Sequence, residues 1–185
     1  MDETDLIGRS KEGDLDSFNS LVESYQGRVY NLSLCMLRNA QAAEDVTQDT
    51  FFSAWRSIGK FRGGSFKAWL MRIATNLCRD QFRLLKHYPT TSLDALPLDS
   101  QDPSSLAELP QDYTERLELA EELRDGLSSI TPEQRLVVIL CDVEGLSYEE
   151  IARVTGCSLG TVKSRLSRGR AQLRDYLRQH GTFPR

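Results

Sequence analysis

The stretch Tyr148–Arg168, YEEIARVTGCSLGTVKSRLSR, is the part of the chain that decides the fold. Ser147 before it and Glu150 within it have the spacing of a capping box, which predicts that a helix begins here. Gly156 stands where that helix needs a left-handed residue, and Ser158 is placed to cap a second helix. A short helix, a glycine turn and a second helix make a helix-turn-helix motif.

The second helix of this motif is expected to have two different sides. Val162 and Leu166, one turn apart, anchor it to the core, which Ile151 and Ala152 of the first helix also face. The remaining side chains carry hydroxyls or positive charge: Thr161, Lys163, Ser164, Arg165, Ser167 and Arg168. Such a face suits the major groove of DNA. An ordinary solvated face is the alternative, and the combination of cap, turn and one-signed charge favours DNA.

Apolar spacing predicts helices in most of the remaining chain. Apolar residues recur every three or four positions in four further stretches: 18–36, 43–58, 66–77 and 117–130. Asp16 is expected to cap the first of these. Thr131, with Pro132 and Gln134, predicts a second capping box before another helix. No stretch alternates with period two, so the fold is expected to be all-α.

The segment between His87 and Glu115 differs from the rest in composition. It contains no lysine or arginine and holds four of the six prolines. Proline fixes φ and lacks an amide donor, which predicts an extended acidic linker. We therefore expect two small helical domains, residues 1–86 and 113–185, joined by a flexible linker at 87–112.

The composition argues against several classes of protein. The net charge is −4, so any DNA binding depends on local basic faces. The four cysteines are far apart, and no Cys/His pair has zinc-ligand spacing, so we expect buried thiols, no metal and no cofactor. The first residues are acidic and no stretch is apolar enough to span a membrane. We therefore expect a cytoplasmic protein without a signal peptide or membrane insertion of its own.

A second motif extends from Ala43 to Arg83, AEDVTQDTFFSAWRSIGKFRGGSFKAWLMRIATNLCRDQFR. It resembles region 2 of the extracytoplasmic-function (ECF, group 4) sigma factors of the sigma-70 family. The segment Pro132–Arg168, with EGLSYEEIA and GTVKSRLSR, resembles their region 4. The resemblance covers nearly the whole chain apart from the linker and the extreme ends. It implies a factor that binds core RNA polymerase, directs transcription initiation from −10 and −35 promoter elements, and catalyses nothing itself.

The resemblance implies a polymerase-binding surface on the acidic helix. Its residues are Glu44, Asp45, Gln48, Asp49 and Phe52. They look like the surface that grips the clamp helices of the largest polymerase subunit, a basic partner for carboxylates. A contact with the polymerase flap is expected as well. Solubility and the acidic start of a helix are alternative explanations of the charge.

The resemblance also implies two DNA-binding surfaces. For the −10 element and its flipped base, the residues are Lys60, Phe61, Arg62, Ser65, Phe66, Arg72, Asn76, Arg79 and Arg83. For the −35 element they are Ser158, Thr161, Lys163, Ser164, Ser167 and Arg168. A core role is the alternative for the aromatic residues, favoured for Trp55 and Trp69 and left open for Phe61. Many relatives have a basic pair where Leu84-Leu85 stands, which weakens phosphate contacts beyond Arg83.

Members of this family are commonly held inactive by an anti-sigma factor, and they associate with the nucleoid when bound to polymerase. The acidic linker resembles the connector that threads toward the polymerase active centre. A helix-turn-helix activator with an N-terminal sensor would explain 148–178 but not 43–83. A metal-dependent enzyme using Glu44, Asp45 and Asp49 is a further alternative. Against it, the only histidines are His87 and His180, and no phosphate loop or nucleophile motif appears.

Overall fold

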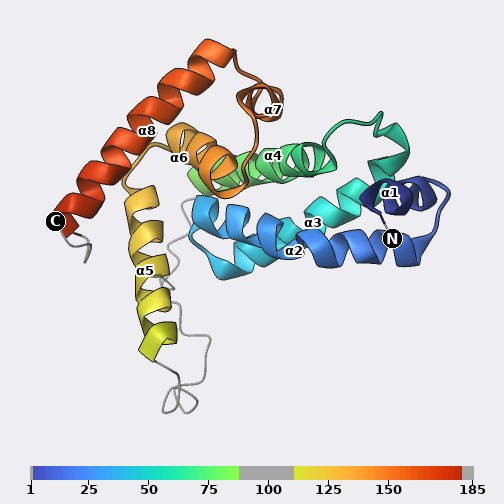
Figure 1. Cartoon of the computed structure of the whole chain (residues 1–185), viewed down its shortest axis with the longest axis horizontal. Helices are drawn as coiled ribbons and strands as arrows, with labels where there is room; N and C mark the ends of the chain where they lie inside the picture. Colours follow the sequence, from blue (N-terminus) through green and yellow to red (C-terminus); the bar gives the residue numbers. More distant parts are fainter. Residues whose placement is uncertain (1, 88–110, 181–185) are drawn as a thin grey trace.

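A computed structural model describes residues 2–87 and 111–180, with side chains at 2–84 and 119–180 (Figure 1). The described part consists of helices and short connections and contains no strand, which confirms the all-α prediction. The predicted linker lies almost wholly outside the described residues.

The N-terminal group consists of four helices and one short turn. They are α1 (Glu3–Lys11), α2 (Leu15–Leu37), α3 (Ala40–Ser57), the 3-10 turn η1 (Ile58–Lys60) and α4 (Phe66–His87). Helices α2, α3 and α4 pack against one another, and α1 packs on α2 (Figure 1). The predicted apolar rows face this core, where Leu21, Leu32, Val46 and Leu70 are fully buried.

The cap of α2 lies two residues before the predicted position. Asp14, rather than Asp16, has an extended backbone and accepts hydrogen bonds from the Asp16 amide at 3.2 Å and the Ser17 hydroxyl at 2.8 Å. The chain turns at Gly13, whose φ is 95°, so the helix starts directly after Asp14. Asp16 falls in the first turn, where its charge is favourable toward the helix dipole.

The C-terminal group is built from helices of very different length. They are α5 (Gln111–Ser128), α6 (Pro132–Val138), the π-helical turn η3 (Ile139–Val143), α7 (Tyr148–Thr155) and α8 (Leu159–His180). The predicted capping box of Ser147 and Glu150 is confirmed, and Gly156 ends α7 with a φ of 72°. The Ser158 hydroxyl accepts the amide of Thr161 at 3.2 Å. The helix-turn-helix prediction is therefore confirmed.

The second predicted capping box is only half formed. The Thr131 hydroxyl accepts the Gln134 amide at 3.4 Å. The buried Gln134 Oε1, in contrast, has no hydrogen-bond partner among the described residues. Helix α8 crosses α6 at this point, where a Cβ placed on Gly169 would lie 3.3 Å from the Gln134 Cβ. The Gln134 side chain is therefore packed under α8.

The two helical groups pack directly against each other. Helix α7 contacts α4, and both α5 and α6 contact α2. The buried apolar side chains of the two groups belong to one continuous core cluster. Figure 1 shows α6 and α7 lying along the N-terminal group, while α5 and much of α8 extend away from it.

Candidate nucleic-acid and polymerase interfaces

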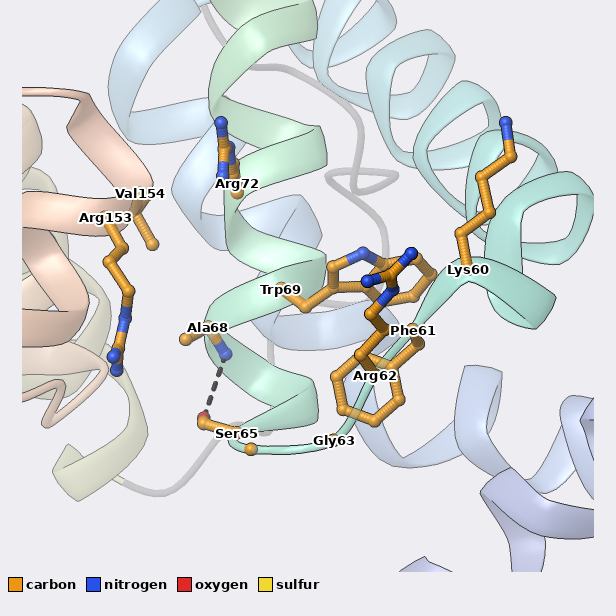
Figure 2. Close-up of a pocket in the computed structure, with 11 residues that line it drawn as sticks. Lys60, Phe61, Arg62, Gly63, Ser65, Ala68, Trp69, Arg72, Arg153 and Val154 are labelled. Atoms are coloured by element: carbon orange, nitrogen blue, oxygen red, sulfur yellow. Dashed lines mark hydrogen bonds between the residues drawn. The ribbon is translucent and has the colours of Figure 1, made fainter.

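The loop between η1 and α4 is shaped by two glycines and a cap. Gly63 (φ 93°) and Gly64 (φ 86°) both adopt the left-handed region, which side chains strongly disfavour. The Ser65 hydroxyl then accepts the Ala68 amide at 3.1 Å and caps the first turn of α4 (Figure 2). These features hold the loop in a sharp turn.

This loop forms one side of a positively charged pocket of about 270 Å³. Lys60 lines it from the end of η1, Arg62 from the loop and Arg72 from α4, while Arg153 approaches from α7 (Figure 2). No carboxylate is among its lining residues, and none of these four cations forms an ion pair within the described part of the chain. Such a pocket attracts phosphate and other anionic groups.

Aromatic rings support the pocket from the core side. Phe61 is 7% exposed, and its ring centroid lies 5.7 Å from Phe66 and 5.4 Å from Trp69. Phe61 and Trp69 also line the pocket, so Phe61 serves the core and the pocket wall together. Trp69 is half-buried and packs on the core, as favoured from the sequence. Trp55 packs there as well, with its ring centroid 5.0 Å from that of Phe18.

The predicted polar stripe of α4 is formed but not uniformly open. Arg72, Asn76 and Arg83 are exposed, and Arg83 pairs with Asp80 at 3.2 Å. Arg79 is half-buried, because its Nη2 donates to the backbone carbonyl of Thr155 at 3.2 Å. One member of the predicted DNA-facing row is thus already bonded to the helix-turn-helix.

The outer face of α8 is open to solvent. Lys163, Ser164, Ser167 and Arg168 are all exposed. The hydroxyls of Ser158 and Thr161 lie 2.9 Å apart at the start of the helix. Arg165, predicted to point outward, is half-buried, since its Nη1 lies 3.5 Å from the Cys157 sulfur. Apart from Arg165 and the half-buried Thr161, the side chains that were predicted to face outward on this helix are exposed.

The acidic face of α3 is the third candidate surface. Glu44, Asp45, Gln48 and Asp49 are exposed, and Phe52 is 62% exposed. The Arg56 guanidinium lies 5.4 Å from the Phe52 ring centroid. A groove of about 450 Å³ between α2 and α3 is lined in part by Glu44 and Gln48. These carboxylates do not form a metal-binding group, and no such group of three or more ligands occurs within the described residues.

Comparison with known proteins agrees with the two sequence motifs. The model of Sigma-70 region 2 matches residues 21–87, and that of Sigma-70, region 4 matches residues 120–173. The chain is 35% identical over 179 residues to the ECF RNA polymerase sigma factor SigW of Bacillus subtilis, covering 93% of this chain and 95% of that protein. This chain belongs to the sigma-70 family, as an ECF sigma factor.

Other relatives support the same placement of this sigma factor. It is 40% identical over 173 residues to ECF RNA polymerase sigma factor SigE of Mycolicibacterium smegmatis, spanning 91% of this chain but 64% of that longer protein. Among solved structures, CnrH in complex with the cytosolic domain of CnrY matches with a TM-score of 0.70 at 27% identity, covering 95% of this chain and 96% of that one. RpoE of Bartonella quintana, in complex with the anti-sigma factor NepR, matches with a TM-score of 0.68 at 26% identity, covering 87% and 96%.

Sequence reasoning missed Arg135, whose side chain makes five hydrogen bonds within the described part of this sigma factor. It is 7% exposed, and burial lowers its pKa. Its guanidinium donates to the carbonyls of Leu127 at 2.7 Å, Ser128 at 3.0 Å, Ile130 at 3.4 Å, Cys35 at 3.2 Å and Met36 at 3.2 Å. An arginine in the last turn of a short helix carries no sequence signal for such a role.

The four cysteines are free thiols, and only Cys78 is fully buried. Burial raises the pKa of Cys78 to about 11 and also raises the pKa of Cys35 and Cys141. The prediction of buried thiols is therefore confirmed for Cys78 and wrong in degree for the other three, which are half-buried. No helix of the described residues is both long and apolar enough to cross a membrane.

Proposed function

We propose that this sigma factor binds core RNA polymerase through α3 and promoter DNA through the α4 pocket and α8. The observation that carries the proposal is the separation of charge over three surfaces. The polymerase-facing side of α3 is acidic and exposed, whereas the α4 pocket and the α8 face are cationic. Each surface thus complements its expected partner, a basic polymerase subunit or DNA phosphate.

The −10 element is assigned to Lys60, Phe61, Arg62, Ser65, Phe66 and the α4 row of Arg72, Asn76, Arg79 and Arg83. The pocket offers cations for phosphates and aromatic edges for an unpaired base. Phe66 is 1% exposed, so its part in the site is to support the rings of Phe61 and Trp69.

The −35 element is assigned to the start and outer face of α8. Ser158 and Thr161 lie at its first turn, followed by Lys163, Ser164, Ser167 and Arg168. A recognition helix places such residues in the major groove, where cations and hydroxyls bond to base edges and phosphates.

We further propose that an anti-sigma factor controls this protein. One of the solved structures that it resembles is a complex of this kind, that of RpoE with the anti-sigma factor NepR. Another holds CnrH in complex with the cytosolic domain of CnrY. The proposal extends to the division of the chain into residues 1–86 and 113–185 around the linker. It also includes contacts with the clamp helices and the flap of polymerase. We further propose that the protein acts in the cytoplasm, is associated with the nucleoid when bound to polymerase, and catalyses no reaction itself.

The decisive test is run-off transcription by core polymerase on a promoter library, with and without this chain.

Asp45→Lys with Asp49→Lys should abolish core binding in a pull-down, because two positive charges would then face a basic partner. Thermal stability should change little, as is usual for exposed positions. Glu12→Lys with Glu23→Lys, also exposed, is the charge-matched control and should retain binding. Undiminished core binding by the folded Asp45/Asp49 variant would contradict the assignment of α3.

A further inference from the structure

Helix α1 touches the loop of the positively charged pocket, although the two lie far apart in the sequence. Lys11, in the last turn of α1, places its Nζ 5.4 Å from the ring centroid of Phe61. Phe61 is 7% exposed and lines the pocket. A cation over the face of an aromatic ring is attracted to it. Helix α1 also contacts η1, the turn directly before Phe61, so the carboxyl end of α1 is joined to the pocket ring.

The amino end of α1 reaches the same group of rings through Tyr25 of α2. The Tyr25 hydroxyl donates to a carboxylate oxygen of Glu3. Burial raises the pKa of this hydroxyl, which therefore stays protonated and able to donate. The Tyr25 ring centroid lies 5.6 Å from that of Phe66 in an edge contact, and Phe66 lies 5.7 Å from Phe61. Both ends of α1 are thus connected to Phe61.

Between these ends, α1 is fixed on the N-terminal group. Ile7 is 9% exposed and Ser10 is 1% exposed, and the Ser10 hydroxyl is satisfied because it donates to the Leu6 carbonyl at 2.6 Å. Arg9 Nη2 lies 2.6 Å from Asp14 Oδ2, across the turn into α2. A helix held in this way can keep Lys11 in place over the ring.

The place of the Phe61 ring matters to the pocket. Figure 2 shows Phe61, Arg62 and Trp69 gathered at the loop, and the Phe61 and Trp69 ring centroids are 5.4 Å apart. An unpaired base stacks on an aromatic ring only if the ring lies where the base arrives. Gly63 and Gly64 directly follow this part of the loop, so contacts from outside the loop help to fix the ring.

We propose that α1 positions Phe61 for the −10 strand, with Lys11 as the positioning residue. Lys11 holds the face of the ring, while Glu3 and Tyr25 hold the neighbouring Phe66. The inference rests on the proposed function of the α4 pocket. Lys11 lies before residues 21–87, which match the model of Sigma-70 region 2. Promoter opening, but neither core binding nor −35 recognition, should therefore depend on a lysine outside the matched region.

Permanganate reactivity of promoter thymines, measured with core polymerase, tests this role. Lys11→Gln should lower the reactivity about two- to fivefold, the range expected for loss of one exposed cation–π contact. Lys11→Arg keeps a cation over the ring and should open promoters like the wild type. Arg178→Gln, with the same loss of charge on an exposed part of α8, is the control and should have no effect. Core pull-down and duplex binding should be unchanged in all three variants.

A second substitution shows whether Lys11 acts through the ring. Phe61→Leu alone should lower the reactivity, and Lys11→Gln added to it should lower it no further, because no ring is left to position. Additive losses would show that Lys11 contacts DNA directly and would overturn the inference. Normal opening by Lys11→Gln beside impaired opening by Phe61→Leu would also overturn it, and would leave the proposed function standing. Normal opening by Phe61→Leu would contradict the proposed −10 role of the loop, and the inference with it.

If circular dichroism shows that Phe61→Leu does not fold, amide hydrogen exchange of the free protein gives the answer without it. The peptide covering residues 58–66 should exchange about two- to fivefold faster in Lys11→Gln than in the wild type, in proportion to the lost contact. Lys11→Arg and Arg178→Gln should exchange at the wild-type rate. Equal exchange in the wild type and Lys11→Gln would overturn the inference.

Discussion

Helices α4 and α8 each have 22 residues, and each carries a row of cationic and polar side chains along one side. The row of α8 is exposed from Lys163 to Arg168 apart from Arg165. The row of α4 is met by α7, which bonds Arg79 and borders the cationic pocket lined by Lys60, Arg62 and Arg72. Two helices of similar pattern therefore differ in what lies opposite them.

The difference arises from the ends of neighbouring helices. The last carbonyls of α2, η3 and α7 need donors, and Arg135, Lys67 and Arg79 provide them. The side chains of Lys163, Ser164, Ser167 and Arg168 on α8, in contrast, are exposed. In the row of α4, Arg79 thus binds a carbonyl of its own chain.

The largest expected effect comes from the link that solvent hardly reaches. Arg135→Met removes five hydrogen bonds to carbonyls and should lower the free energy of unfolding by about 3 kcal/mol. Arg168→Met, the same substitution on the open face of α8, should change it by about 0.5 kcal/mol or less. Urea unfolding followed by circular dichroism measures both. Equal effects would contradict the contrast between the buried Arg135 and the exposed face of α8.

On the exposed face of α8, single substitutions should affect promoter binding rather than folding. Lys163→Ala or Arg168→Ala should weaken use of the −35 element by about 1–3 kcal/mol where the side chain contacts a base. A phosphate contact would instead weaken binding to all sequences about equally. Transcription from promoters with single −35 substitutions distinguishes the two cases. If both variants transcribe every promoter like the wild type, α8 does not read the −35 element.

The sequence was sufficient to predict the helices and the helix-turn-helix, because caps and apolar spacing act locally. Ser147 and Gly156 cap one short helix and Glu150 lies in its first turn, and their predicted roles are confirmed. The partner of Arg79 was not predictable in this way, because periodicity indicates which side is polar but not what it touches. Phe61 was left open for the same reason: a ring that lines a pocket and a ring in the core have the same sequence pattern.

A smaller effect, on the opening of promoter DNA, is expected for the polar row of α4. Asn76 is exposed on α4, one turn after the pocket residue Arg72, so Asn76→Ala should leave folding intact. If the −10 assignment holds, this substitution removes one hydrogen bond to an unpaired base, worth about 1 kcal/mol. Permanganate reactivity of promoter thymines in the complex with core polymerase should fall, while duplex binding changes less. Lys163→Ala, on the exposed face of α8, is the matched control. It should weaken duplex binding more than it lowers permanganate reactivity. Normal reactivity with Asn76→Ala would count against the −10 assignment of α4.

The smallest expected effects are the coupling energies of the two ion pairs that link the N-terminal and C-terminal helical groups. Asp125 and Arg38 are both about half exposed, so a double-mutant cycle with alanine should give a coupling of about 0.2–1 kcal/mol that decreases with added salt. Arg28 and Glu144 differ from them because the Glu144 side chain is 3% exposed, where solvent screens the attraction less. Their coupling should therefore be the larger of the two and the less sensitive to salt. Urea unfolding of the single and double variants at two salt concentrations provides both values. A larger coupling for the exposed pair would show that burial of Glu144 does not strengthen its ion pair with Arg28.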